Sequence, residues 1–124
     1  MRRTLERWFA AWIERDASVI NDVFAGKIVY SECYGPEYRG IGQIHRWFDE
    51  WNRKGRVLEW TIRESYCDGD TIIAVWYFCC EYEGNTAGFD GVTIARFGAE
   101  GKITSLREFQ SDPKHVFPYG KELC

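Results

Sequence analysis

Apolar positions at the start of the chain repeat with the period of a helix. They follow the i, i+3, i+4, i+7, i+8 spacing of one helix face, at Leu5, Trp8, Phe9, Trp12 and Ile13. Asp16 then stands where it can cap a second, short helix, whose apolar positions run from Val19 to Phe24. Ala25-Gly26 follows and predicts the end of that helix. The chain therefore begins with two helices.

The pattern changes at Lys27. Residues 27–34 are rich in β-branched and aromatic side chains, which predicts a strand, and the Gly and Pro residues of 35–40 predict a loop. A third helix is predicted over residues 41–54, with Ile44, Phe48 and Trp51 on one face and Gly55 at its end.

Turn signals divide the rest of the chain into long strands. Asp68-Gly69-Asp70, Gly84-Asn85 and the segment 98–101 separate the ranges 56–67, 71–83, 86–97 and 102–111. Hairpin connections make these strands antiparallel neighbours in a meander. Gly88 and Gly91 predict a bulge or bend in the third of them.

The predicted order of elements is ααβαββββ. Long strands that twist strongly tend to curl, and helices packed against a curled sheet enclose a hollow. We therefore expect an α+β fold, a conical barrel in which a strongly bent antiparallel sheet wraps helices around an internal pocket. A chain of 124 residues can fold as one domain over 1–124. Residues 113–124 are predicted to be an irregular C-terminal tail draped over the body.

Composition adds an apolar cavity to this picture. Aromatic residues make up 17% of the chain, including 6 Trp, and so many rings suit a cavity wall as well as a core. The formal net charge of -3 argues against a nucleic-acid partner. No apolar run approaches the roughly 20 residues of a membrane span, and the N-terminus does not resemble a signal peptide. We expect a soluble cytoplasmic protein without a membrane partner.

The cysteines point to a reducing compartment and away from a metal. Their number, 5, is odd, and they lack the spacing of a disulfide framework. Cys79 and Cys80 are neighbours on a predicted strand, so their side chains point to opposite faces. Because the chain has no Cys-x-x-Cys or His-x-x-x-His spacing, we predict no metal site and no cofactor.

Several motifs resemble a known superfamily. They are the Tyr34-Gly35-Pro36-Glu37-Tyr38-Arg39-Gly40 loop before a Trp-rich helix, and the closing pattern Phe89-Asp90-Gly91-Val92, Arg96-Phe97, Gly101-Lys102-Ile103 and Leu106-Arg107-Glu108-Phe109. Together with the element order, they resemble the nuclear-transport-factor-2-like superfamily, and within it the SnoaL-like branch, from Leu5 to about Asp112. The resemblance implies a conical barrel that holds a ligand in the cone and forms a homodimer through the outer sheet face. It does not select one activity, because the superfamily includes isomerases, cyclases, dehydratases, epoxide hydrolases and non-catalytic binders.

The ketosteroid-isomerase branch of that superfamily implies a position for a catalytic base. The isomerase's aspartate base corresponds to Glu32 here, and its oxyanion-binding tyrosine corresponds to Trp12. Its supporting tyrosines correspond to Phe24 and Phe48, and its protonated acid to Thr93. A dienolate needs two strong donors, and Trp12 has a single indole N–H, so the resemblance does not extend to steroid isomerisation.

Glu32 is the first catalytic candidate. It shares a strand face with Tyr30 and Tyr34, and inside a cone its carboxyl would be partly desolvated, with a raised pKa suited to proton transfer near neutral pH. The alternative is a solvent-facing Glu at an edge, or one paired with Arg39 or Arg63.

Glu108 is the second catalytic candidate. It alternates with Leu106 and Gln110, and the resemblance places this stripe inside the cone, where two carboxyl groups can act as an acid and a base. The alternative is a structural Glu that is hydrogen-bonded to a Trp N–H or a Tyr OH.

The ligand-binding candidates share aromatic character or a position facing the expected cone. They are Trp12, Tyr30, Phe48, Trp51, Trp60, Trp76, Asp90 and Thr93. The alternatives are that the aromatic residues only build the core and that Asp90, beside Gly91, only forms a turn.

One strand also predicts a homodimer. The even positions 76–82 and the odd positions 75–81 of the strand 71–83 are both apolar enough to be covered. A sheet covered on both faces needs a core on one side and a partner on the other, and we expect the partner to be a second copy.

These features support more than one function. The first is a cofactor-free acid–base enzyme of the isomerase, cyclase or hydrolase type that acts on a small, largely apolar molecule, with Glu32 as base and Glu108 as its partner. The second is a non-catalytic module that binds such a molecule, and the third is a structural dimeric domain with a filled cone.

Overall fold

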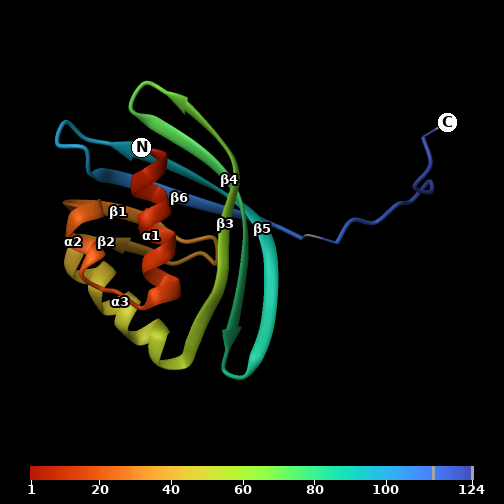
Figure 1. Cartoon of the computed structure of the whole chain (residues 1–124), viewed down its shortest axis with the longest axis horizontal. Coiled ribbons are helices and arrows are strands. Elements are labelled where there is room, and N and C mark those ends of the chain that lie inside the picture. The colour runs from red at the N-terminus through yellow and green to blue at the C-terminus, as the bar shows by residue number, and fades with distance from the viewer. Residues whose placement is uncertain (113, 124) are drawn as a thin grey trace.

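The backbone of the protein is a bent sheet with helices on one side of its long strands (Figure 1). The structure is a computed structural model that describes residues 1–112 and 114–123. Its helices are α1 (Arg2–Glu14), α2 (Val19–Val23) and α3 (Ile41–Lys54). Its strands are β1 (Phe24–Ser31), β2 (Glu37–Arg39), β3 (Gly55–Asp68), β4 (Thr71–Tyr82), β5 (Asn85–Phe97) and β6 (Ile103–Ser111). The α+β fold with a bent sheet is therefore confirmed.

The sheet has the strand order β2-β1-β6-β5-β4-β3. Strands β3 to β6 form the predicted antiparallel meander. Two features were not predicted. The short strand β2 lies inside the predicted loop and pairs antiparallel with β1, and β1 pairs parallel with β6. The parallel pairing joins the N-terminal half of the chain to the far end of the meander.

The glycines of β5 do not form a bulge against β4. The register of β4 and β5 runs without a shift from Thr71 to Tyr82, so the bulge predicted at Gly88 and Gly91 is wrong. Register shifts occur instead in the pairing of β3 with β4, in that of β1 with β6, and at the Arg96–Phe97 end of the pairing of β5 with β6. Gly91 makes room for a ring, because a Cβ there would collide with the indole of Trp76 and lie 2.7 Å from the carbonyl oxygen of Phe109.

Helix α1 forms the predicted apolar face and buries most of it. Its buried residues are Leu5, Trp8, Phe9, Ala11 and Trp12, whereas Ile13 is exposed. They pack against the inward-facing residues of the sheet, including Tyr30, Trp76 and Leu106, in one hydrophobic core. The core thus lies between the helices and the concave side of the sheet.

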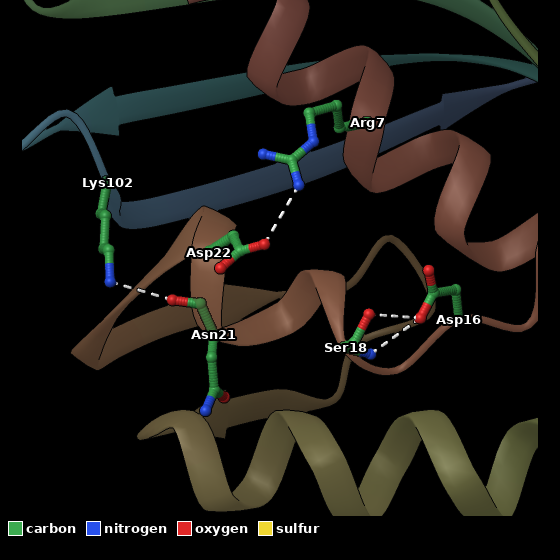
Figure 2. A network of polar contacts seen from close by, with 6 residues as sticks. All are labelled: Arg7, Asp16, Ser18, Asn21, Asp22 and Lys102. Carbon is green, nitrogen blue, oxygen red and sulfur yellow. Dashed lines mark hydrogen bonds and ion pairs between the residues drawn. The ribbon is translucent and has the colours of Figure 1, made fainter.

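Polar contacts fix the short helix α2 to its neighbours (Figure 2). Arg7 of α1 pairs with Asp22 at 3.1 Å, and Nζ of Lys102 donates to the carbonyl oxygen of Asn21 at 2.9 Å. Asp16 accepts hydrogen bonds from the backbone N–H and hydroxyl of Ser18, at 3.0 and 2.6 Å, in the turn before the helix. The cap predicted for Asp16 is therefore a turn contact, since no side chain caps α2.

The end of the chain leaves the body after β6 (Figure 1). Residues 114–123 contain no helix or strand, as predicted for the tail. Their large side chains are open to solvent, with Val116 84% and Tyr119 100% exposed, so the prediction that the tail drapes over the body is wrong. Pro113 and Cys124 lie outside the described residues. Over the described part of the chain, no helix has the length and apolar character needed to cross a membrane.

A chain of buried polar groups crosses the core beside the apolar side chains. The indole N–H of Trp8 donates to the hydroxyl of Tyr30 at 3.1 Å, and that hydroxyl donates to Oε2 of Glu108 at 2.6 Å. Glu108 is 7% exposed, and burial raises its pKa from the ordinary value of 4.5 to about 8. The negative charge of Glu32 raises it further, whereas hydrogen bonds from Tyr30 and from the backbone of Cys33 oppose the rise.

This raised pKa predicts a pH dependence of stability. Between about pH 4.5 and 8 the folded protein holds a proton on Glu108 that the unfolded chain releases. The free energy of unfolding should therefore fall as the pH rises through this window, by at most about 1.4 kcal/mol per pH unit from this group. In Glu108→Gln, the amide oxygen can still accept a hydrogen bond from Tyr30, but no carboxyl titrates. The free energy of unfolding of this variant should therefore decrease less between about pH 4.5 and 8 than that of the wild type.

Urea denaturation at a series of pH values measures this effect. Glu100→Gln, in the exposed turn between β5 and β6, is the control and should keep the wild-type slope. An unchanged slope in Glu108→Gln would show that this carboxyl does not hold its proton in the folded state.

Candidate functional site

A small hollow lies between the helices and the sheet and opens toward a wider cleft. The hollow has a volume of about 30 Å³, and its walls are Trp12, Glu32, Tyr34, Trp47, Trp51, Val57, Trp60 and Phe78. The cleft has a volume of about 490 Å³, and its walls are Glu32, Tyr34, Pro36, Trp51, Cys80, Tyr82, Asn85 and Ala87. Because Glu32, Tyr34 and Trp51 line both, the hollow and the cleft adjoin.

The backbone around Glu32 is held in a tight connection between β1 and β2. The N–H of Glu32 donates to the carbonyl oxygen of Pro36 at 2.9 Å, and the N–H of Gly35 donates to the carbonyl oxygen of Glu32 at 3.0 Å. Gly35 has a φ of 111°, which a residue with a Cβ rarely adopts. These contacts place Glu32 just past the end of β1, at the boundary between hollow and cleft.

The carboxyl of Glu32 is half-buried among aromatic rings. Burial raises its pKa, and a hydrogen bond from the hydroxyl of Tyr38 to Oε2, at 2.9 Å, opposes the rise. The ring of Tyr38 is itself stacked on Trp47, with 4.4 Å between ring centroids. The ion pairs considered as alternatives for Glu32 are not observed, since Arg39 pairs with Glu37 and Arg63 with Asp90. A carboxyl in this setting can exchange a proton with a molecule in the cleft.

Glu108 faces the core and is absent from the walls of the hollow and the cleft. Its hydrogen bond from Tyr30 matches the structural alternative named for it from the sequence. Glu32 is near enough for its charge to raise the pKa of Glu108. The two carboxyl groups are thus close enough to influence each other electrostatically, but only Glu32 lines the hollow and the cleft.

The predicted ligand-binding residues divide into two groups. Trp12, Trp51 and Trp60 line the hollow, and Trp51 also lines the cleft. Tyr30, Phe48, Trp76 and Thr93 are buried in the core, where the indole N–H of Trp76 donates to the hydroxyl of Thr93 at 2.8 Å. Asp90 neither reaches the cleft nor forms a turn. It lies on β5 opposite Tyr77 and pairs with Arg63 at 3.6 Å.

Several residues of the site were missed from the sequence. Tyr34 ends the strand predicted over 27–34 and lines both the hollow and the cleft. Tyr38 belongs to the predicted loop 35–40 and lines neither space, but it faces the core because β2 places it opposite Tyr30, and its hydroxyl donates to Glu32. A strand of 3 residues is too short to show an alternation of polar and apolar positions, so the sequence carried no signal that predicts β2. The sequence placed three further lining residues, Phe78, Cys80 and Tyr82, on one face of a strand together with Trp76. This alternation could have identified them as candidates for the ligand-binding site.

Other reactive groups do not form a centre within the described residues. Burial raises the pKa of Cys33 to about 12, so its thiol keeps its proton at neutral pH and is a poor nucleophile. Within residues 1–112 and 114–123, no three His, Cys, Asp or Glu side chains gather as a metal site would require. The chemistry of the walls therefore depends on Glu32 and its hydrogen bond from Tyr38.

Solved structures share this fold at low sequence identity. A hypothetical protein of ketosteroid isomerase-like fold from Catenulispora acidiphila, in complex with trimethylamine, is 22% identical with a TM-score of 0.76, over 86% of this chain and 83% of that one. An LEH-like epoxide hydrolase from M. tuberculosis is 16% identical with a TM-score of 0.78, over 88% and 80%. A protein from Mesorhizobium loti assigned as a SnoaL-like polyketide cyclase is 18% identical with a TM-score of 0.69, over 87% and 97%. At these identities the likeness concerns the fold alone.

The sequence itself matches one family model. A search of curated proteins finds no significant match to the chain. The model of the SnoaL-like domain matches residues 5–106, a range that runs from α1 into β6 and contains Glu32 with most of the walls of the hollow and cleft. The resemblance expected from the sequence is thus confirmed, and the chain belongs to the SnoaL-like domain family.

Proposed function

We propose that this protein binds a small, largely apolar molecule in the hollow and cleft and that Glu32 exchanges a proton with it. The observation that supports this most is the place of Glu32, whose half-buried carboxyl lines both spaces among aromatic rings. A cleft of about 490 Å³ lies within the range usual for small-molecule sites. The reaction would be cofactor-free acid–base catalysis of the isomerase, cyclase or hydrolase type.

Structural relatives agree with this class of reaction without selecting a member of it. One is an epoxide hydrolase and another is assigned as a polyketide cyclase. In our proposal Glu32 acts as the base, and the hydroxyl of Tyr38 holds its carboxyl in place. Glu108 has a supporting role, because its hydrogen bond from Tyr30 joins β6 to β1, the strand that Glu32 follows.

A second candidate is a non-catalytic binding module. One observation favours it: Glu32 is the only carboxylate among the described residues that line the hollow and the cleft. An acid–base pair in which both members touch the ligand is then missing from the walls, and proton transfer would depend on Glu32 alone.

We also propose that the outer face of the sheet binds a second copy of the chain. Inter-strand pairing puts partly exposed apolar side chains side by side on this face, namely Ile73, Val75, Val92, Ile94 and Phe109. Charges of both signs lie around them, since Arg63 and Asp90 form an ion pair and Arg107 covers the ring of Phe109. A face with both signs can complement itself about a two-fold axis, which favours a homodimer.

Substitution of Glu32 tests the catalytic proposal. Cyclohexene oxide, followed for hydrolysis, and cyclohexanone, followed for exchange of its α-protons in D₂O, sample two reactions of this class. Where the wild type turns over either probe, Glu32→Gln should lower the rate by at least about 100-fold, because the amide cannot take up a proton.

Glu37→Gln is the matched control. Glu37 lies on β2, next to Tyr38, and is bound to Arg39 and Ser31 outside the hollow and cleft. Its variant should keep the wild-type rate. Turnover that survives in Glu32→Gln would remove Glu32 from the mechanism, whereas wild-type binding of both probes without turnover would favour the binding module.

Sedimentation equilibrium tests the homodimer. The wild type should have twice the 14.6 kDa mass of one chain at micromolar concentration. Val75→Lys should shift the equilibrium toward the monomer, because it would bury an unpaired charge in the centre of the interface. Glu100→Gln changes the net charge by the same amount away from this face and should leave the mass unchanged. A monomeric wild type would contradict the proposal.

A further inference from the structure

The carboxyl of Glu32 is the one charged group that lines the hollow and the cleft. Among the described residues that form these walls, none is Lys, Arg, His or Asp. Arg39 and Arg63, the two cations considered for Glu32 from the sequence, are paired with other carboxylates. A half-buried carboxylate is costly without a compensating positive charge, and here that charge can come from a ligand.

One oxygen of this carboxyl is open to the space that Glu32 lines. Oε2 accepts the hydrogen bond from the hydroxyl of Tyr38 at 2.9 Å. Oε1 accepts no hydrogen bond from the described residues, and it does not belong to the buried polar atoms that lack a partner. A group in the cleft can therefore approach Oε1 directly.

Aromatic rings form much of the remaining wall. They are Trp12, Trp47, Trp51, Trp60 and Phe78 in the hollow, and Tyr34, Trp51 and Tyr82 in the cleft. The face of such a ring attracts a cation that lies within about 6 Å of its centroid. The ring of Tyr34 is 54% exposed, and its one aromatic neighbour among the described residues, Phe89, lies at an angle of 83° to it. A perpendicular neighbour covers at most one face, so the other face of Tyr34 is open to a ligand.

These walls suit an alkylated ammonium better than a metal ion or a primary ammonium. Within residues 1–112 and 114–123, no three His, Cys, Asp or Glu side chains lie together as metal ligands. A primary ammonium has three N–H groups that each need an acceptor, whereas alkyl groups on a cationic nitrogen pack directly against aromatic faces. The volume of the cleft, about 490 Å³, also leaves room for further apolar substituents.

We propose that the ligand of the cleft carries a tertiary or quaternary alkylammonium group, which lies between Oε1 of Glu32 and the ring of Tyr34. Trp51 of α3 and Tyr82 of β4 would contact its alkyl substituents. This inference rests on the proposed function, because it assigns a charge to the molecule that binds in the same hollow and cleft.

A cation in this place also suits the role of Glu32 as a base. Burial raises the pKa of Glu32 and so favours its protonated form. A positive charge close to the carboxyl favours the ionised form, which is the form that can accept a proton. Binding of the ligand would therefore increase the fraction of Glu32 that is ready to act.

Choline and 3,3-dimethylbutan-1-ol test this inference. The two molecules have nearly the same shape and differ in charge, because a carbon atom of the alcohol replaces the nitrogen of choline. Ligand-observed NMR titration at pH 7 gives the affinity of each, and the wild type should bind choline at least about tenfold more tightly. The ratio of the two affinities is measured within one protein, so a partly unfolded variant does not distort it.

Two substitutions, each with a matched control, should change this ratio. Glu32→Gln should lower it about tenfold because the amide carries no charge, whereas Glu37→Gln removes a charge outside the hollow and cleft and should leave it unchanged. Tyr34→Leu should lower it about threefold, the effect of one cation–π contact. Tyr66→Leu should keep the wild-type ratio, because Tyr66 is similarly exposed, at 57%, and lines neither space.

Four results would overturn the inference while leaving the proposed function in place. They are binding of cyclohexanone without binding of choline, binding of 3,3-dimethylbutan-1-ol as tight as that of choline, an unchanged ratio in Glu32→Gln or Tyr34→Leu, and an equal fall in the matched control. A wild type that binds neither of these probes, nor cyclohexanone or cyclohexene oxide, would overturn both the inference and the proposed function.

Discussion

The parallel pairing of β1 with β6 is the constraint on which the rest of the structure depends. It sets Tyr30 opposite Leu106 and so brings the hydroxyl of Tyr30 to Glu108, 78 positions later in the chain. Closing a loop of that length has an entropic cost that grows only slowly with length, and the buried contacts along the pairing offset it. Without this pairing, β1 and β2 would not join the meander, and Glu32, which follows β1, would not be held beside the walls that β3 and β4 contribute.

The aromatic rings of the core explain why the hollow is small. Trp8 and Trp12 lie on one face of α1 and contact Tyr30, Trp47 and Phe48 at centroid distances of 4.5 to 6.4 Å. From the sheet side, Trp60 packs between Phe9 and Trp76. Rings that pack in this way fill most of the space between the helices and the sheet, and the hollow that remains is bordered by Glu32 and Tyr34. The free volume therefore lies at the mouth and not at the centre.

Local signals made most of the fold predictable. The turn signals at 68–70, 84–85 and 98–101 placed the long strands to within a few residues, because turn chemistry and strand alternation are both properties of neighbouring residues. The parallel β1–β6 pairing was beyond such signals, since period and propensity carry no information about a partner that is distant in sequence. The prediction of a bulge at Gly91 was wrong for a similar reason, because the role of this glycine depends on a residue distant in sequence. The indole of Trp76, on the neighbouring strand, occupies the space that the missing side chain leaves.

The candidate site was predictable only in part. Glu32 was found through a family resemblance, whereas Tyr38 depends on a strand of 3 residues, and the division of the aromatic residues between wall and core depends on how the sheet bends. Parity along a strand tells which side chains share a face. It cannot tell which of them lie beneath a helix, as Trp76 does, and which lie beside an opening, as Trp60 does.

The two carboxyl groups have different electrostatic roles because only one of them is sealed in the core. Burial holds the proton of Glu108 up to about pH 8, so this group is neutral at pH 7 and places no negative charge behind Glu32. Glu32, which is only half-buried, can then lose its proton without a like charge beside it. If Glu108 were ionised, the pKa of Glu32 would rise further, and its carboxylate form would be scarcer at neutral pH. The burial of Glu108 thus affects the chemistry of the cleft from a position that no ligand in the cleft touches.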